Sequence, residues 1–402
     1  MKFDVVQLES TGIDVIDGDR GKNYPHQNEL LSTGFCLFLS AKNVTKSGFS
    51  FSETQFISQR KDALLNNGRL CRGDIVITTR GTVGNVALYS PQVPYENIRI
   101  NSGMLIIRCA NNISNQYLYQ VLRSEWFQKQ IMAVQSGSAQ PQLPKSHFLK
   151  MNIPLPPLPI QEKIASILQL IDDKITTNNS INDNLEQQAQ ALYQELFITN
   201  TDPSWETGTI SNLGTVIGGS TPSKARPEYY TKNGIAWITP KDLSINKSKF
   251  ITHGESDITE LGLKNSSATV MPEGTVLFSS RAPIGYIAIA AGNITTNQGF
   301  KSVVPNAEIG TVYVYYYLKQ NLSMIERLAS GSTFKEVSGG TMKSVPAIVP
   351  DSKTIQEFNN FCLPIFEQQK VLETQNRTLA GLRDSLLPKL MSGELDVSAV
   401  EL

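Results

Sequence analysis

Apolar residues recur at alternating steps of four and three between residues 164 and 196. The positions of this stripe are Ile164, Leu168, Ile171, Ile175, Asn178, Asn182, Leu185, Ala189, Leu192 and Leu196. A stripe held for five repeats of seven residues predicts a long helix that packs against another helix as a coiled coil. We expect this helix to run from Ile160 to Phe197, and its 38 residues would make it about 57 Å long.

The same stripe returns 194 residues later in the chain. Its positions are Phe358, Cys362, Ile365, Gln369, Leu372, Asn376, Leu379, Arg383, Leu386 and Leu390. Asn182 and Asn376 take the same place in the two stripes, where a buried Asn costs stability but penalises shifted registers. Either stripe alone would favour an ordinary amphipathic helix, whereas the two together favour an intramolecular antiparallel pair. Pro364 lies inside the second stripe and should kink or break that helix.

Proline-rich segments lead into both helices. Four prolines in the first segment exclude helix and predict a stiff extended lead, namely Pro154, Pro156, Pro157 and Pro159. The second segment, VPAIVPDSK from Val345, contains Asp351, which we expect to cap the helix that follows.

Residues 1–155 and 201–350 show short β-rich runs separated by Gly, Asn and Pro turns. The clearest runs are DIVITT at 74–79, MLIIRC at 104–109, TVLFSS at 275–280 and YIAIA at 286–290. In each half a helical stretch follows, at 115–132 and at 310–329. The predicted fold class is α+β, with two globular α+β domains separated by two long antiparallel coiled-coil helices. The predicted divisions are 1–155, 156–200, 201–350 and 351–402.

The two halves also repeat a set of short motifs in the same order. The pairs are FLSAKNV at Phe38 with WITPKDL at Trp237, GDIVITTRGTVG at Gly73 with GTVLFSSRAPIG at Gly274, NSG at Asn101 with NQG at Asn297, SGS at Ser136 with SGS at Ser330, and IQE at Ile160 with IQE at Ile355. Their offsets are 199, 201, 196, 194 and 195 residues. We infer an internal pseudo-two-fold duplication, in which one kind of task is performed on two different targets.

Composition is that of a folded protein, with 40% hydrophobic and 18% charged residues among 402. No apolar run approaches the roughly 20 residues needed to span a bilayer, and the acidic start is unlike a signal peptide, so we expect a cytoplasmic protein without membrane contact. Net charge is zero, yet residues 156–200 hold two basic and six acidic residues, while residues 1–155 hold 16 basic and 11 acidic ones. The globular segments thus carry a small positive excess, the sign that phosphate binding requires.

The residue types that carry catalysis or metal binding are scattered. The four cysteines form no CxxC pair and the three histidines are isolated, so neither a zinc site nor a disulfide framework is indicated. There is no GxxxxGK[ST] or GxGxxG phosphate loop and no Asn-Pro-Pro-aromatic motif. We expect a non-catalytic chain that binds no cofactor or metal itself.

Arg80 and Arg281 occupy matching positions where a strand opens into a tight turn. An arginine there can contact guanine or clamp a phosphate, with help from the hydroxyls of Thr79, Thr82 and Ser280. The alternative is an arginine that caps the strand or pairs with a carboxylate. Because the arginine recurs in both copies, we favour phosphate positioning or a structural role over base recognition.

Lys42 and Asn43 in the first copy match Lys241 and Asp242 in the second. Asn can recognise adenine and Asp can accept from cytosine, so the difference suits specificity. A turn that requires an Asx residue explains the pattern nearly as well.

Further candidates for groove or phosphate contact follow the two SGS motifs. They are Gln140, Gln142 and Lys145 in the first copy, Thr333, Lys335 and Lys343 in the second, and Lys224, which has no aligned counterpart. A Ser-Gly turn of purely structural use is an equal alternative.

The ordered motifs, the IPLPPLPIQE lead and the tail LRDSLLPKLMSGEL at Leu382–Leu395 together resemble the specificity subunit of type I restriction-modification systems over essentially the whole chain. The resemblance implies that residues 1–155 and 201–350 are target-recognition domains, each of which recognises one half of a split site in double-stranded DNA. It also implies that the helices set the spacing and dock two methylation subunits, to which restriction subunits add the nuclease. S-adenosylmethionine, ATP and Mg²⁺ are then expected on those partners.

Two other hypotheses remain open from the residues alone. The chain could be a non-catalytic coiled-coil scaffold whose globular domains bind protein, in which case it would show no salt-dependent retention on duplex DNA. It could also be a nuclease with an unrecognised site, which would cleave DNA with magnesium and without partners.

Overall fold

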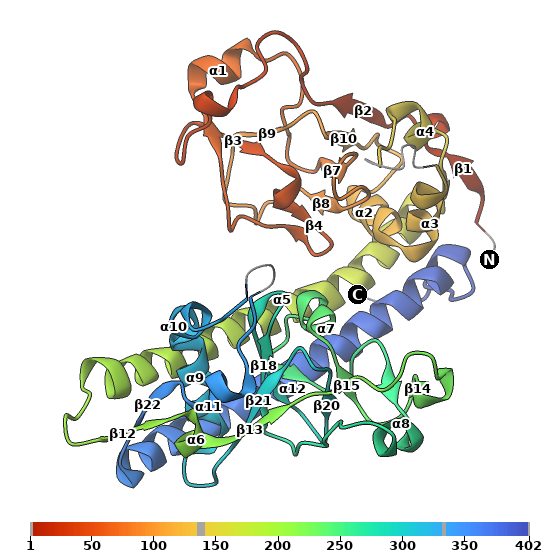
Figure 1. Cartoon of the computed structure of the whole chain (residues 1–402). Coiled ribbons are helices and arrows are strands. Elements are labelled where there is room, and N and C mark those ends of the chain that lie inside the picture. Colours follow the sequence, from red (N-terminus) through yellow and green to blue (C-terminus); the bar gives the residue numbers. More distant parts are fainter. Residues whose placement is uncertain (1–2, 135–140, 332–334, 401–402) are drawn as a thin grey trace. The chain divides into compact units, whose positions relative to one another are not determined.

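The computed structural model describes residues 3–134, 141–331 and 335–400, and the chain divides into two compact units. Unit 1 comprises residues 1–175 and 378–402, and unit 2 comprises residues 176–377. Each unit combines one globular segment with part of both long helices (Figure 1). The boundaries at 155, 200 and 350 therefore stay a prediction.

Unit 1 contains a four-stranded antiparallel sheet in the order β2-β10-β7-β8. A second sheet pairs β3 with β6 antiparallel and with β9 parallel, and two-stranded pairs join β1 to β11 and β4 to β5. The strands are β1 (Val5–Gln7), β2 (Asp14–Asp17), β3 (Cys36–Leu39), β4 (Val44–Thr45), β5 (Gly48–Phe49), β6 (Phe56–Ile57), β7 (Ile75–Thr78), β8 (Val86–Leu88), β9 (Ile98–Ile100), β10 (Met104–Arg108) and β11 (Asn152–Pro154).

Unit 2 contains a five-stranded sheet in the order β13-β21-β18-β19-β16, together with the pairs β12-β22, β14-β17 and β15-β20. The strands are β12 (Glu206–Thr209), β13 (Gly214–Gly218), β14 (Tyr230–Thr231), β15 (Trp237–Ile238), β16 (Phe250–Ile251), β17 (Asp257–Ile258), β18 (Val276–Ser280), β19 (Ile284–Ala290), β20 (Thr295–Thr296), β21 (Lys301–Pro305) and β22 (Pro346–Val349). The order β13-β21-β18-β19 repeats β2-β10-β7-β8, and the parallel pair β15-β20 repeats β3-β9. The duplication predicted from the motifs is thus present in the sheets.

Each predicted helical stretch after the sheets is divided in two by a polar residue. In unit 1, α2 (Asn115–Arg123) ends at Ser124 and α3 (Glu125–Val134) begins after it. The Ser124 hydroxyl donates to the Val121 carbonyl at 2.6 Å and accepts from the Phe127 amide at 3.1 Å, so it serves both helix ends. In unit 2, Asn321 separates α9 (Gly310–Gln320) from α10 (Leu322–Arg327).

Each unit also contains short helices. They are α1 (Gln59–Leu64) and α4 (Lys145–Leu149) in unit 1, and α6 (Ile210–Leu213), α7 (Pro240–Ile245), α8 (Glu260–Lys264) and α11 (Gly339–Lys343) in unit 2.

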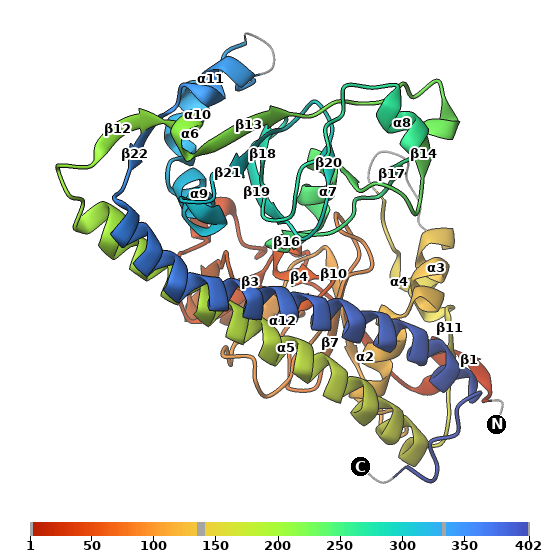
Figure 2. The ribbon, with the colours of Figure 1, turned by 90° about the horizontal axis from the view of Figure 1, so that it is seen from below.

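The two long helices are α5 (Leu158–Gln194), which a π-helical turn at Glu195–Thr199 extends, and α12 (Ser352–Ser392). In each unit their segments lie side by side and antiparallel (Figure 2). In unit 1, Ile164 and Leu168 share a core with Leu387 and Leu390. In unit 2, Ala189 and Tyr193 share a core with Phe358 and Cys362. All twenty positions of the two predicted stripes are buried or half-buried, and the predicted fold class is confirmed.

The buried asparagines of the pair meet in unit 2. Asn178 Nδ2 donates to Asn376 Oδ1 at 2.9 Å, and Asn376 Nδ2 donates to Asn179 Oδ1 at 2.8 Å. Asn182 instead receives a bond from Gln369 through its backbone oxygen, at 3.2 Å. The asparagine that faces Asn376 is therefore Asn178, one step earlier in the stripe than Asn182.

The predicted extended conformation at Pro159 and the predicted break at Pro364 are wrong, whereas a kink at Pro364 stays a prediction. Helix α12 continues through Pro364 without a break, because Pro364 and Asn360, whose carbonyl loses its helical partner, are both exposed to water. Helix α5 begins at Leu158, so Pro159 lies in its first turn, where backbone amides lack intrahelical partners anyway. Asp351 caps α12 as expected, since its Oδ1 accepts from the amides of Lys353 and Thr354 at 2.9 and 3.0 Å.

A carboxylate on α5 ties the helix to the globular segment in both units. In unit 1, Asp172 accepts from Arg123 of α2 at 2.9 Å and from Arg383 of α12 at 2.8 Å. In unit 2, Glu186 accepts from Lys319 of α9 at 2.7 Å and from Lys249, which directly precedes β16. Arg123 and Lys319 are separated by 196 residues, which is also the offset of the Asn-X-Gly motifs. The two cations therefore occupy matching positions in the two copies.

Candidate nucleic-acid interface

In each unit a pair of parallel strands brings two loops that carry matched sequence motifs to the same end of the strands. Strand β3 pairs with β9 in unit 1, and β15 pairs with β20 in unit 2, each in parallel register. The carboxyl ends of parallel strands meet at the same edge, which is where α/β sheets place ligands. Lys42 and Asn43 thus lie near Asn101–Gly103, and Lys241 and Asp242 lie near Asn297–Gly299. We call these places the strand-end sites.

An Asn-X-Gly turn forms the centre of each strand-end site. Asn101 Oδ1 accepts from the Gly103 amide at 2.9 Å, and Asn297 Oδ1 accepts from the Gly299 amide, also at 2.9 Å. The glycine carbonyl then accepts from Thr79 in unit 1 at 2.7 Å and from Ser280 in unit 2 at 2.8 Å. The motif match found in the sequence therefore reflects one turn, built twice with the same hydrogen bonds.

The two arginines lie beside these turns. A Cβ on Gly103 would lie 3.5 Å from the Cβ of Arg80, and one on the neighbouring Gly81 would lie 3.7 Å from the Cβ of Ala41. Arg80 is exposed, whereas Arg281 is half-buried and its Nη1 lies 3.5 Å from a carboxylate oxygen of Glu336. In unit 2 the arginine thus lies at the limit of hydrogen-bonding distance from a carboxylate. This arrangement agrees with the alternative interpretation, in which the arginine pairs with a carboxylate and has a structural role.

The matched lysines each form an exposed ion pair. Lys42 contacts Glu53 at 2.7 Å, and Lys241 contacts Glu255 at 2.6 Å. The Glu255 carboxylate raises the pKa of Lys241 by accepting its hydrogen bond. Because exposed ion pairs contribute little to stability, both ammonium groups can exchange their glutamate for a phosphate.

Asn43 and Asp242 are buried and their side chains are occupied within the fold. Asn43 Oδ1 accepts from the Ser40 amide at 2.9 Å and caps the short 3-10 helix Ala41–Asn43. Asp242 Oδ2 accepts from the Thr239 amide at 2.7 Å, and its Oδ1 accepts from the Glu255 amide at 2.8 Å. These bonds favour the interpretation of a turn that requires an Asx residue, because few acceptor sites remain for a base.

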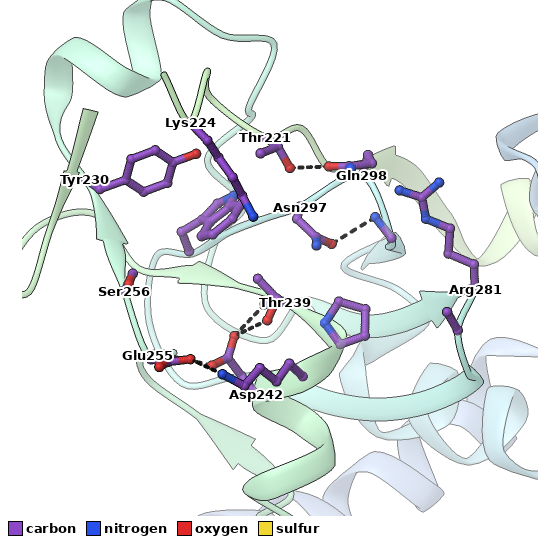
Figure 3. Close-up of a pocket in the computed structure, with 15 residues that line it drawn as sticks. Thr221, Lys224, Tyr230, Thr239, Asp242, Glu255, Ser256, Arg281, Asn297 and Gln298 are labelled. Carbon is purple, nitrogen blue, oxygen red and sulfur yellow. Dashed lines mark hydrogen bonds and ion pairs between the residues drawn. The ribbon is translucent and has the colours of Figure 1, made fainter. Parts of the chain in front are cut away.

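In unit 2 the strand-end site opens into a cleft of about 720 Å³. Lys224 extends into it from one side, and Arg281 lies across from it (Figure 3). Trp237 and Tyr230 form an edge-to-face pair in its lining, with ring centroids 5.6 Å apart. Arg226, next along the segment, pairs with Glu228 at 3.5 Å. A cleft lined by three cations, Lys224, Lys241 and Arg281, and by an aromatic pair suits a phosphate backbone and bases.

The other predicted contact residues are dispersed around the units. Thr79 and Ser280 are buried at the strand ends, and Thr82 is exposed in the turn that follows Arg80. Gln142 pairs with Arg80 through the backbone, and Lys145 donates to the Val15 carbonyl. Lys335 and Lys343 are exposed, while Gln140 and Thr333 lie outside the described residues.

The sequence motifs contain the turn at the centre of each site, but residue type alone does not mark the middle residues of that turn, Ser102 and Gln298, as contact residues. The signal that could have found them is their difference inside a motif that otherwise matches. Among the described residues, no group of three His, Cys, Asp or Glu side chains is arranged to hold a metal ion. Within the same ranges, no helix combines the length and apolar character needed to cross a membrane.

The two units are copies of one α+β module, and each carries a polar, cation-bearing strand-end site. A family model described as the type I restriction modification DNA specificity domain matches residues 11–187 and again residues 203–377. Since these two matches cover most of the chain, the protein belongs to the type I restriction modification DNA specificity family, with one domain in each half.

Individual relatives agree with this assignment. The chain is 40% identical over 167 residues to the type I restriction enzyme MjaIX specificity subunit of Methanocaldococcus jannaschii, a match that covers 41% of this chain and 38% of that subunit. It is 23% identical to the HindI specificity subunit of Haemophilus influenzae, over 94% of this chain and 98% of that subunit. The fold is similar to the S subunit of a type I system from M. genitalium, with a TM-score of 0.58 and 14% identity over 97% of this chain and 96% of that one.

Proposed function

We propose that this chain is the non-catalytic DNA-recognition subunit of a cytoplasmic type I restriction-modification enzyme. Each strand-end site contacts one half of a bipartite site in double-stranded DNA. The helix pair sets the spacing between the half-sites and docks two methylation subunits, to which restriction subunits can be added. S-adenosylmethionine, ATP and Mg²⁺ belong to those partners in this proposal.

The observation that carries the proposal is the repetition of one turn with different surroundings. The hydrogen bonds of Asn101 and Asn297 are the same, while the residues around them differ, as unit 2 adds Lys224. Two equivalent surfaces that differ in their outward groups suit two different half-sites.

The proposal is tested with the chain bound to its methylation subunits. Single-molecule methylation sequencing of cells that express the complex should yield one bipartite motif with two unlike halves. Binding to duplex DNA should weaken steeply with salt, because phosphate contacts release counterions. Salt-independent retention would instead favour a protein-binding scaffold, and sustained cleavage of DNA by the chain alone with magnesium would favour a nuclease.

The spacing role has its own test, a matched deletion in both helices. Asn178 faces Asn376, and Gln369 bonds to Asn182, so residues 178–184 of α5 lie against residues 370–376 of α12. Removal of both seven-residue segments shortens the pair by about 10 Å, which corresponds to about three base pairs. The motif should keep both half-sites and lose spacing between them. An altered half-site with unchanged spacing would contradict the role.

A further inference from the structure

We propose that the middle residue of the Asn-X-Gly turn, Ser102 in unit 1 and Gln298 in unit 2, contacts a base and sets how strictly each unit discriminates at that base position. This inference rests on the proposed function and assigns base discrimination to two side chains. Gln298 recognises adenine by a bidentate contact, whereas Ser102 discriminates weakly among bases.

Both middle residues are held by the same kind of hydrogen bond, in which the asparagine Oδ1 accepts from the glycine amide. The asparagine before and the glycine after each are joined at 2.9 Å in both units. The carbonyl oxygen of the middle residue itself faces a cation: Arg20 Nη2 at 3.4 Å from Ser102, and Lys301 Nζ at 3.4 Å from Gln298. The two side chains therefore leave equivalent points of the fold, each beside a cation that also pairs with a carboxylate, Asp17 in unit 1 and Glu336 in unit 2.

The flanking positions leave little room for variation. A Cβ on Gly299 would lie 3.0 Å from both Asn297 Oδ1 and Pro240 Cγ, and one on Gly103 would lie 3.3 Å from Asn101 Oδ1. Any side chain larger than hydrogen would press on the bond that closes the turn. The middle residue can change without disturbing that bond, and it is the residue that differs between the copies.

The two side chains differ in what they can recognise. Gln298 is exposed at the rim of the cleft, and the Thr221 hydroxyl donates to its Oε1. Figure 3 shows this contact, with Arg281 close by. Thr221 orients the carboxamide, and both Nε2 hydrogens and one Oε1 lone pair remain for a base. Glutamine in this state matches N7 and N6 of adenine, while a serine hydroxyl fits several bases.

The two residues also differ from the earlier candidates Asn43 and Asp242. Those side chains are buried and bonded to backbone amides on their own loops. Gln298 is exposed and Ser102 is half-buried, and Thr221, another residue of the cleft lining, donates to Gln298 Oε1. Among these positions, the middle residue of the turn is therefore the better placed for contact with DNA.

The test uses the complex with methylation subunits and compares methylated motifs for Gln298→Ser and Ser102→Gln with the wild type. Gln298→Ser should relax preference at one base position of one half-site by about 5- to 150-fold, the range expected for one bidentate contact. The other half-site should stay unchanged. Ser102→Gln should sharpen preference for adenine in the opposite half-site. Gln320→Ser, which makes the same change at the exposed end of α9, is the matched control and should leave the motif as in the wild type.

Three results would overturn the inference. One is a Gln298→Ser motif with wild-type preference at every position, and another is a change in both half-sites at once. The third is uniform loss of methylation at an unchanged melting temperature, which would assign Gln298 to general affinity. Failure of the proposed function is distinct, since the wild-type complex would then show no bipartite motif at all.

Discussion

Replacement of Glu186 by glutamine should destabilise unit 2 through its buried lysine. Glu186 accepts from Lys249, from Lys319 at 2.7 Å and from the Tyr316 hydroxyl at 3.0 Å. The Lys249 side chain is only 8% exposed, so loss of the carboxylate charge leaves an ammonium group with little access to water. Gln369 Oε1, at 2.7 Å from Lys249, offers partial compensation.

The size of the effect follows from the pKa of Glu186. Burial alone would raise this pKa, but the ammonium groups of Lys249 and Lys319 outweigh burial and lower it from 4.5 to about 2. A shift of this size corresponds to about 3 kcal/mol. Because the folded-state pKa is the lower one, this stabilisation is fully present above pH 4.5 and is lost as the pH falls towards 2.

Scanning calorimetry and guanidinium unfolding between pH 7 and pH 3 provide the measurement. At pH 7, Glu186→Gln should lower the free energy of unfolding of unit 2 by about 2 to 3 kcal/mol. Its melting temperature should fall by about 5 to 10 °C. The variant should also lose less stability than the wild type on acidification. Addition of Lys249→Met should restore part of the loss, because the unpaired charge is then removed.

Glu357→Gln is the matched control, since Glu357 is an exposed glutamate on α12 in the same unit. It should change stability by less than about 0.5 kcal/mol. The reasoning would be refuted if Glu186→Gln behaved like this control at pH 7, or if it kept the acid sensitivity of the wild type.

Three further predictions concern the turn, the cap and the helix pair. Arg281→Ala should weaken binding of the complex to all duplexes alike and reduce the slope of log K against log salt by about 0.9. Fluorescence anisotropy measures both quantities, and a changed half-site would instead indicate that Arg281 contacts a base. Asp242→Ala should lower the melting temperature of unit 2 through loss of about 1 to 2 kcal/mol from the capping box that Asp242 forms with Thr239. An unchanged melting temperature would contradict this capping role. The double change Asn178→Leu and Asn376→Leu should raise the denaturation midpoint, because Asn178 Oδ1 is buried without a hydrogen-bond partner among the described residues; a lower midpoint would show that the amide pair stabilises the helices.

The helix pair could be predicted from the sequence because its pattern is local and periodic. Each stripe repeats over five heptads, and burial at positions such as Leu168 and Phe358 follows directly from that repeat. The divisions of the shorter helices at Ser124 and Asn321 could not be predicted in this way. There a single polar side chain competes with the backbone, and the apolar pattern continues past it.

The candidate site was only partly accessible from the sequence for a different reason. Its loops are about 60 residues apart in the chain, and the parallel pairing of β3 with β9 that unites them is non-local. Asn43 resembled a base-contacting residue because its type fits that role, but residue type alone does not show that the amide is bonded to Ser40. The matching motifs did indicate which loops belong together, and the differences inside them indicate Ser102 and Gln298.

The carboxylates that tie the helix pair to the globular segments, Asp172 and Glu186, both lie on α5. The first half of the chain therefore contains both carboxylates, and the second half contains neither. A homodimer of residues 1–200 would carry its own Asp172 beside Arg123 in each copy. In residues 201–402, the positions that match Asp172 and Glu186 at an offset of 194 are Phe366 and Ala380. A homodimer of that second half would therefore bury Lys249 without Glu186, and the nearby carboxylate that remains, Glu373, accepts from the backbone amides of Lys249 and Phe250. A gene split at the middle of this chain would yield one half suited to self-association and one that depends on the other.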